Sequence, residues 1–229
     1  KVVRDSNMEL LRIIAMLLVM IVHANFRALP VPTAEETNTE TISSILRFFT
    51  ESFSIICVNL FILLSGWYGI KIKIKRLLEF IFQVLFFSII GFTIIQLIEP
   101  GEYSIKQGIS KLLLVNRWDY WFVKAYLGLY LFSPILNTFI EHVTQKQYQL
   151  TLFLFYSFQT IYGWLFPTGA IYFENGYSAM SFMGLYLLAR YIRLYPIKFW
   201  QKSYIFDVLV YTSITLFTTV ITFTLKKYN

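Results

Sequence analysis

The chain has 229 residues, of which 57% are hydrophobic and 14% are charged, and its mean hydropathy is +0.59. Soluble domains carry roughly a quarter charged residues, so this composition excludes an ordinary water-soluble globular protein. The formal net charge of +7 does not indicate nucleic-acid binding, because the lysines and arginines fall in short loops between apolar runs, where membrane orientation explains them. We therefore expect an integral membrane protein with no nucleic-acid partner.

The apolar runs predict an all-α fold, a polytopic transmembrane helix bundle. A helix needs about twenty apolar residues to cross the hydrocarbon core, and no stretch shows the period-two alternation of a membrane β-barrel. We predict seven spans, at residues 9–29, 50–70, 77–98, 120–140, 148–166, 178–195 and 204–225. Residues 1–229 are interpreted as one transmembrane domain that is cut at both ends and lacks more at the C-terminal end.

The distribution of basic residues predicts the orientation. With the N-terminus in the cytoplasm, the loops on the inside hold most of the lysines and arginines, as the positive-inside rule requires. This inside set is Lys1, Arg4, Lys71, Lys73, Lys75, Arg76, Lys146, Arg190, Arg193, Lys198 and Lys202. We therefore expect a multi-pass protein of the cell (plasma or inner) membrane with a cytoplasmic N-terminus.

Two ionisable residues in the first span are the main candidates for chemistry, because such groups are costly inside a membrane and usually functional. Arg12 and His23 are eleven residues apart, almost three helical turns, so they share one face and lie about 16 Å apart along the axis. Two plainer interpretations stay open. Arg12 can extend to the headgroups or pair with Glu9, and His23 can bond a neighbouring backbone carbonyl.

Four segments along the chain carry motifs in a fixed order. They are Glu9–Ala15 with His23 further along, Asn59–Trp67 with its Ser-Gly pair, Trp118–Phe122 followed by Tyr130–Pro134, and Gly184–Arg193. Together they resemble the acyltransferase-3 family of membrane proteins. The resemblance implies about ten spanning helices, so about three would lie beyond the seven predicted here. Relatives often carry a histidine just before the Trp-Phe pair, where this chain has Asp119-Tyr120.

The resemblance implies transfer of an acyl group, usually acetyl from acetyl-CoA, to a hydroxyl of a cell-surface or exported glycan. His23 would remove the hydroxyl proton, or would carry the acetyl group itself. Arg12 would bind a phosphate of coenzyme A through its planar guanidinium. Lys75 and Arg76 would assist on the same membrane side, although orientation alone also explains them. Acetyl-CoA enters as a substrate, and we expect no bound cofactor and no metal ion.

Residues near the start of the fourth predicted span are candidates for binding the acceptor. Trp121 can stack on a sugar, or it can belong to an interfacial aromatic belt. Lys124 and Asp119 lie on either side of it, and Lys124 can extend to the headgroups or contact a sugar or an acyl carbonyl. Glu174, in a predicted outer loop, is a further candidate for sugar contact, whereas His142 is interpreted as a solvated residue at a helix end.

The alternative function is a membrane transporter, such as a flippase for a lipid-linked sugar. It would use Arg12 and His23 to bind its substrate or to relay protons. The sequence lacks the duplicated helices broken by glycine or proline that many transporters contain. We therefore predict an acyltransferase whose partners are acetyl-CoA, a glycan or lipid-linked sugar acceptor, and membrane lipids.

Overall fold

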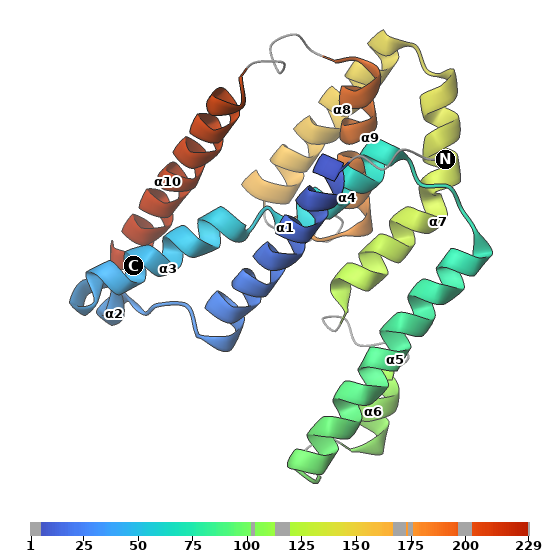
Figure 1. Cartoon of the computed structure of the whole chain (residues 1–229). Coiled ribbons are helices and arrows are strands. Elements are labelled where there is room, and N and C mark those ends of the chain that lie inside the picture. Colours follow the sequence, from blue (N-terminus) through green and yellow to red (C-terminus); the bar gives the residue numbers. More distant parts are fainter. Residues whose placement is uncertain are drawn as a thin grey trace. The chain divides into compact units, whose positions relative to one another are not determined.

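The computed structural model describes residues 6–101, 104–112, 120–166, 173, 176–196 and 203–228. Every regular element in these ranges is helical, which confirms the predicted all-α fold (Figure 1). In chain order the elements are α1 (Ser6–Val22), η1 (His23–Ala28), α2 (Ala34–Thr39), α3 (Thr41–Ser54), α4 (Cys57–Tyr68), α5 (Ile74–Ile98), α6 (Ile105–Leu112), α7 (Trp121–His142), α8 (Gln145–Thr160), η2 (Ile161–Leu165), α9 (Ala179–Leu194) and α10 (Tyr204–Tyr228). The two η elements are π-helices, in which hydrogen bonds join residues five apart.

Five helices among the described residues are long and apolar enough to cross a membrane. They are Ser6–Phe26, Thr41–Tyr68, Ile74–Ile98, Trp121–His142 and Tyr204–Tyr228. These helices overlap five of the seven predicted spans. The other two predicted spans fall on α8 with η2 and on α9, which are not among these five; α8 and α9 have 16 residues each. The total of seven spans therefore stays a prediction.

The second span begins earlier than predicted. Its first helix, α3, starts at Thr41, whereas the apolar run alone indicates a start at Thr50. Hydropathy does not mark residues 41–47 because they mix serine, threonine and arginine with apolar residues. They are nevertheless helical, and the helix buries a side that includes Ser44 and Phe48. The chain turns at residues 55–56 and continues as α4.

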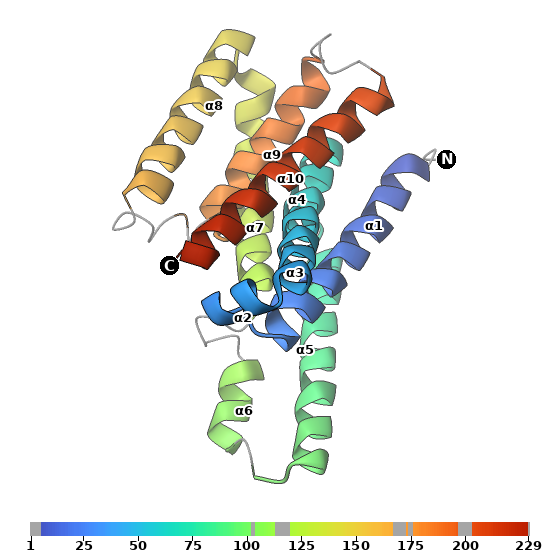
Figure 2. The ribbon, with the colours of Figure 1, turned by 90° about the vertical axis from the view of Figure 1, so that its left-hand side faces the viewer.

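The described chain forms two compact units, each with a core of its own. The first contains α1, η1, α2, α3, nearly all of α4, and α10. Within it α10 packs along α3 and α2, and α1 also packs on α3 (Figure 1, Figure 2). Its core includes Ala15, Leu18, Phe48 and Ile62, which are all buried. A single domain over residues 1–229 stays a prediction.

The second unit contains α5, α6, α7, α8, η2 and most of α9. Its core includes the buried side chains of Leu129, Phe182 and Tyr186. Gly128 lets α7 approach α9 closely, because a Cβ added at Gly128 would lie 2.8 Å from the Cβ of Ala179. Small residues at helix contacts are typical of membrane bundles. The two helices are therefore in contact although 50 residues of sequence separate these positions, roughly the length of two membrane spans with a connection.

Candidate functional site

Arg12 lies in α1 and pairs with an acid of the same helix. Its Nη1 donates to Oε1 of Glu9 at 2.9 Å, and both side chains are 43% exposed. The pairing with Glu9 that the sequence left open is therefore present. A half-exposed pair at this spacing contributes only about 0.2–0.5 kcal/mol, so an anionic ligand can replace Glu9 at little cost.

His23 is the first residue of η1, and its imidazole is exposed. Its Nδ1 lies 2.8 Å from the carbonyl oxygen of Val19. Since a carbonyl only accepts, Nδ1 carries the hydrogen, and the neutral ring has its lone pair on Nε2. A nitrogen in this state can remove a proton or attack a carbonyl carbon. His142, in the last turn of α7, makes the same contact with the Thr138 carbonyl at 2.8 Å. What distinguishes His23 is that it lies inside a span, whereas His142 is the last residue of one.

The side of α1 on which Arg12 and His23 lie borders the packed side. Because the α-helix continues up to His23, the eleven steps from Arg12 end only about 20° beyond three full turns. The packed side is marked by the buried Ala15 and Leu18, and both candidates are rotated about 100° from its centre. The opposite side carries exposed apolar residues such as Met20. The pair therefore lies at the border between the packed and the exposed sides.

A polar contact between η1 and α3 was missed at the level of sequence. The side-chain amide of Asn25 donates to the Arg47 carbonyl at 2.9 Å and to Oε2 of Glu51 at 3.2 Å. Arg47 in turn donates from Nη2 to the Asn25 carbonyl at 3.3 Å and to the Pro30 carbonyl. The useful signal was that Asn25 and Glu51 are polar residues within predicted spans, where such groups are costly. This contact fixes the turn that begins at His23.

Three side chains of α7 and α9 hold the connection between α4 and α5. The Tyr186 hydroxyl accepts from the Ile70 amide at 3.0 Å and donates to Oδ1 of Asn137 at 2.6 Å. Asn137 donates from Nδ2 to the Ile70 carbonyl at 2.8 Å, which closes a cycle of three hydrogen bonds. The Tyr130 hydroxyl bonds both the amide and the carbonyl of Lys73, at 2.9 and 3.2 Å. We call these three side chains the tyrosine–asparagine clamp.

The segment that the clamp holds is rich in exposed cations. Gly69 begins it with a φ of +78°, a backbone conformation that favours glycine. Nη1 of Arg190 lies 3.5 Å from the position that a Cβ on Gly69 would occupy. The exposed cations of the segment and of the first turn of α5 are Lys71, Lys73, Lys75 and Arg76. The segment therefore presents positive charge on a backbone that side chains of other helices fix.

Helix stability does not explain why Lys75 and Arg76 stand where they do. α5 begins at Ile74 with no acid in its first turn and no side-chain cap. Cations at this end oppose the helix dipole, at a cost of about 0.3–1 kcal/mol each. Lys75 lies 4.0 Å from Oε1 of Glu79, but both side chains are more than half exposed, so the pair is weak. Membrane orientation or attraction of an anion accounts for these residues.

Trp121 begins α7 and packs against other aromatic rings. Its ring centroid lies 4.8 Å from that of Tyr177 in an edge-on arrangement. Lys124 is half-buried about one turn further along α7. Asp119 and Glu174 lie outside the described residues. Of the predicted site residues that are described, the first unit contains Arg12 and His23, and the second contains Lys75, Arg76, Trp121 and Lys124.

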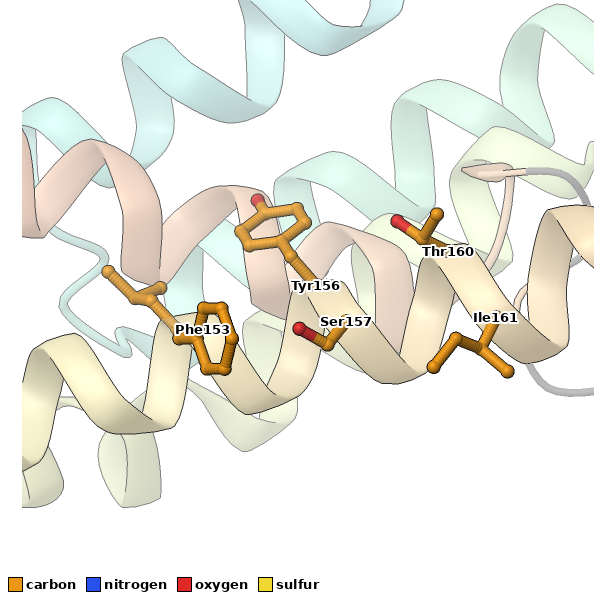
Figure 3. Close-up of a pocket in the computed structure, with 6 residues that line it drawn as sticks. Phe153, Tyr156, Ser157, Thr160 and Ile161 are labelled. Carbon is orange, nitrogen blue, oxygen red and sulfur yellow. The ribbon is translucent and has the colours of Figure 1, made fainter.

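A groove of about 530 Å³ runs along α8 and η2 (Figure 3). Its lining has no charged side chain and consists of Leu152, Phe153, Tyr156, Ser157, Thr160 and Ile161. The Tyr156 hydroxyl is buried and has no hydrogen-bond partner among the residues that the structure describes. None of the residues predicted to take part in catalysis lines this groove, so it does not contribute to the candidate site.

These observations define a multi-pass helical membrane protein with an ionisable pair in its first span and a fixed basic segment before α5. A family model described as an acyltransferase domain matches residues 5–227. The chain therefore belongs to the acyltransferase-3 family, as the ordered motifs predicted, and this supports a membrane acyltransferase. Comparison with curated proteins and with solved structures found no match.

Proposed function

We propose that this protein is a membrane-bound O-acyltransferase that transfers an acetyl group from acetyl-CoA to a hydroxyl of a cell-surface or exported glycan. The observation that carries the proposal is the His23 imidazole, whose Nδ1 lies 2.8 Å from the Val19 carbonyl oxygen, so that the neutral ring has its lone pair on Nε2. This imidazole belongs to a membrane span of a chain in the acyltransferase-3 family. Its exposed position lets a substrate reach Nε2.

A sugar hydroxyl is a weak nucleophile until a base removes its proton. In the proposed reaction Nε2 of His23 takes this proton while the hydroxyl oxygen bonds to the carbonyl carbon of the thioester. The carbon–sulfur bond then breaks, and the sulfur of coenzyme A takes the proton back from the imidazolium. In a second route Nε2 itself bonds to the acetyl carbon, and the carbon–sulfur bond breaks to release coenzyme A as a thiolate. The hydroxyl oxygen then takes the acetyl group as the bond to Nε2 breaks, and the hydroxyl proton passes to the thiolate. Both routes require an unprotonated Nε2.

Arg12, Lys75 and Arg76 are proposed to bind the phosphates of the donor. A guanidinium matches a phosphate with two parallel hydrogen bonds, and the first turn of α5 adds backbone N–H groups that point toward an anion. In support, Lys75 and Arg76 stand at a helix end where cations otherwise cost stability. With the predicted cytoplasmic N-terminus, Arg12 and these two residues lie on the side of the plasma or inner membrane where acetyl-CoA is available.

The acceptor is proposed to meet the opposite side of the membrane, near the start of α7. Trp121 offers an aromatic face for stacking on a sugar, and Lys124 a donor for a sugar or acyl oxygen. Asp119 and Glu174 are proposed as acceptors of sugar hydroxyl hydrogen bonds. These assignments rest on the residue types and on the predicted orientation.

The proposal is tested with the purified full-length protein in proteoliposomes and acetyl-CoA labelled in its acetyl group. We expect release of coenzyme A and appearance of label on the glycan. Movement of a lipid-linked sugar across the bilayer without turnover of coenzyme A would instead identify a transporter. Such a result would overturn the enzymatic proposal.

Donor binding is tested separately with the double variant Lys75→Ala/Arg76→Ala. Each lost phosphate contact is worth about 1.5–3 kcal/mol, so the KM for acetyl-CoA should rise at least about tenfold. The matched control is Lys146→Ala, which removes an exposed lysine from the first turn of α8. An equal KM in the two variants would show that Lys75 and Arg76 serve orientation only.

A further inference from the structure

The π-helical turn that follows α1 is fixed by side chains of α3. Asn25 within the turn bonds the Arg47 carbonyl and the Glu51 carboxylate, and Arg47 bonds the Asn25 and Pro30 carbonyls. The Arg47 guanidinium also lies 5.8 Å from the centre of the Phe26 ring. All of these contacts lie within the first unit. They join the turn that begins at His23 to the start of the second span.

The charge of Arg47 is directed at backbone carbonyls. Among the described residues Arg47 has no ion pair, and its Nε is buried without a hydrogen-bond partner. The last carbonyls of a helix have no partner within the helix; η1 ends at Ala28, and the residue after it, Leu29, is extended. Arg47 supplies hydrogen bonds to carbonyls at this end. Arg47 is half-buried, and its hydrogen bonds to the Asn25 and Pro30 carbonyls hold the π-turn on α3.

A π-turn is rare, and it holds one residue more than the α-turn that it replaces. If η1 relaxed to an α-helix, the residues on its two sides would rotate relative to each other by about 100°, the angle of one residue. Asn25, two residues after His23 within this turn, is hydrogen-bonded to α3. The rotation would therefore change the orientation of His23, the first residue of η1, and alter its contact with the Val19 carbonyl.

We propose that Arg47, with Asn25 and Glu51, is a positioning unit for His23. The unit holds the π-turn, and the turn keeps the imidazole in the orientation in which Nδ1 donates to Val19 and Nε2 faces outward. None of the three residues needs to touch a substrate. The catalytic consequence rests on the proposed function, in which Nε2 of His23 is the base or the acyl carrier, whereas the structural consequence for the imidazole does not.

Residues 1–229 contain two histidines, so His142→Gln leaves His23 as the sole histidine among them. ¹⁵N-histidine NMR of this 229-residue chain in bilayers then reports which nitrogen of His23 carries the hydrogen. We expect one tautomer, protonated at Nδ1. Adding Arg47→Met, which keeps an unbranched flexible side chain but removes the donors, should give a mixture of both tautomers. Arg47→Lys keeps the positive charge and one donor nitrogen and should restore part of the Nδ1 signal.

Arg193→Met is the matched control. Arg193 also belongs to the first unit, donates to a backbone carbonyl, that of Trp67, and lies 5.6 Å from the centre of the Trp67 ring. Its removal should leave the His23 tautomer unchanged. If Arg47→Met does not fold, as judged by size-exclusion elution, Asn25→Ala removes the other half of the contact and carries the same expectation.

Kinetics supply the second readout. Misplacing a catalytic group by about 1 Å can cost about 100-fold in rate, so Arg47→Met should lower kcat by about this factor and change the KM for acetyl-CoA less than about twofold. A wild-type tautomer and a wild-type kcat in folded Arg47→Met would overturn the positioning role. If Arg47→Met changes the tautomer but His23→Gln keeps full activity, the positioning unit stands and the proposed function fails.

Discussion

Replacement of Tyr186 by phenylalanine tests the tyrosine–asparagine clamp. The Tyr186 side chain is fully buried, and its hydroxyl both accepts from the Ile70 amide and donates to Asn137. Tyr186→Phe therefore leaves a buried N–H and a part-buried amide oxygen without this partner. A buried polar group that loses its partner costs about 1–3 kcal/mol, so we expect the free energy of unfolding to fall by roughly 2–5 kcal/mol.

Tyr148→Phe is the control for this variant. Tyr148 is also buried, and its hydroxyl donates to the Leu187 carbonyl at 2.7 Å. Because α9 continues beyond Leu187, that carbonyl keeps its helical partner, and the expected loss is only about 1 kcal/mol. Both values are measurable by reversible unfolding in mixed detergent micelles. Equal losses in the two variants would refute the view that Tyr186 bridges two otherwise unsatisfied groups.

Two further predictions concern packing and the donor. Gly184→Ala should destabilise the protein by about 1–3 kcal/mol, since the new Cβ would overlap the Phe155 ring. Gly91→Ala in α5 meets open space and should be neutral or slightly stabilising. Thermal melting of both variants checks this, and equal melting temperatures would contradict the packing argument. Glu9→Gln should change the free energy of unfolding by less than about 0.5 kcal/mol but lower the KM for acetyl-CoA, because it removes a carboxylate that competes with a phosphate for the Arg12 guanidinium. An unchanged KM would argue against donor binding by Arg12.

The spans were predictable because a bilayer imposes length and hydropathy on a helix. Trp121–His142 and Tyr204–Tyr228 begin within one residue of their predicted starts. The start of α3 was missed, since its first turns carry polar residues and gain stability from packing rather than hydropathy. The π-turn at His23 also could not be predicted, because the sequence does not show which backbone carbonyl each backbone amide will bond.

The clamp and the positioning unit were harder to predict for a different reason. Ile70 and Tyr186 are 116 residues apart in sequence, and a tyrosine in an apolar helix is usually interpreted as core. Asn25 and Glu51 offered a better signal, since polar residues within predicted spans require partners. The spacing of Arg12 and His23 predicted their shared side, but only coordinates showed that Arg12 pairs with Glu9.

The most direct test of the account compares two histidine variants of the full-length protein in the labelled acetyl-CoA assay. His23 and His142 each bond a carbonyl four residues earlier in a helix, at the same distance of 2.8 Å, so the variants differ mainly in position. The account predicts that His23→Gln loses acetyl transfer by a factor of about 100 or more, while His142→Gln keeps the wild-type rate. Wild-type transfer by folded His23→Gln would contradict it.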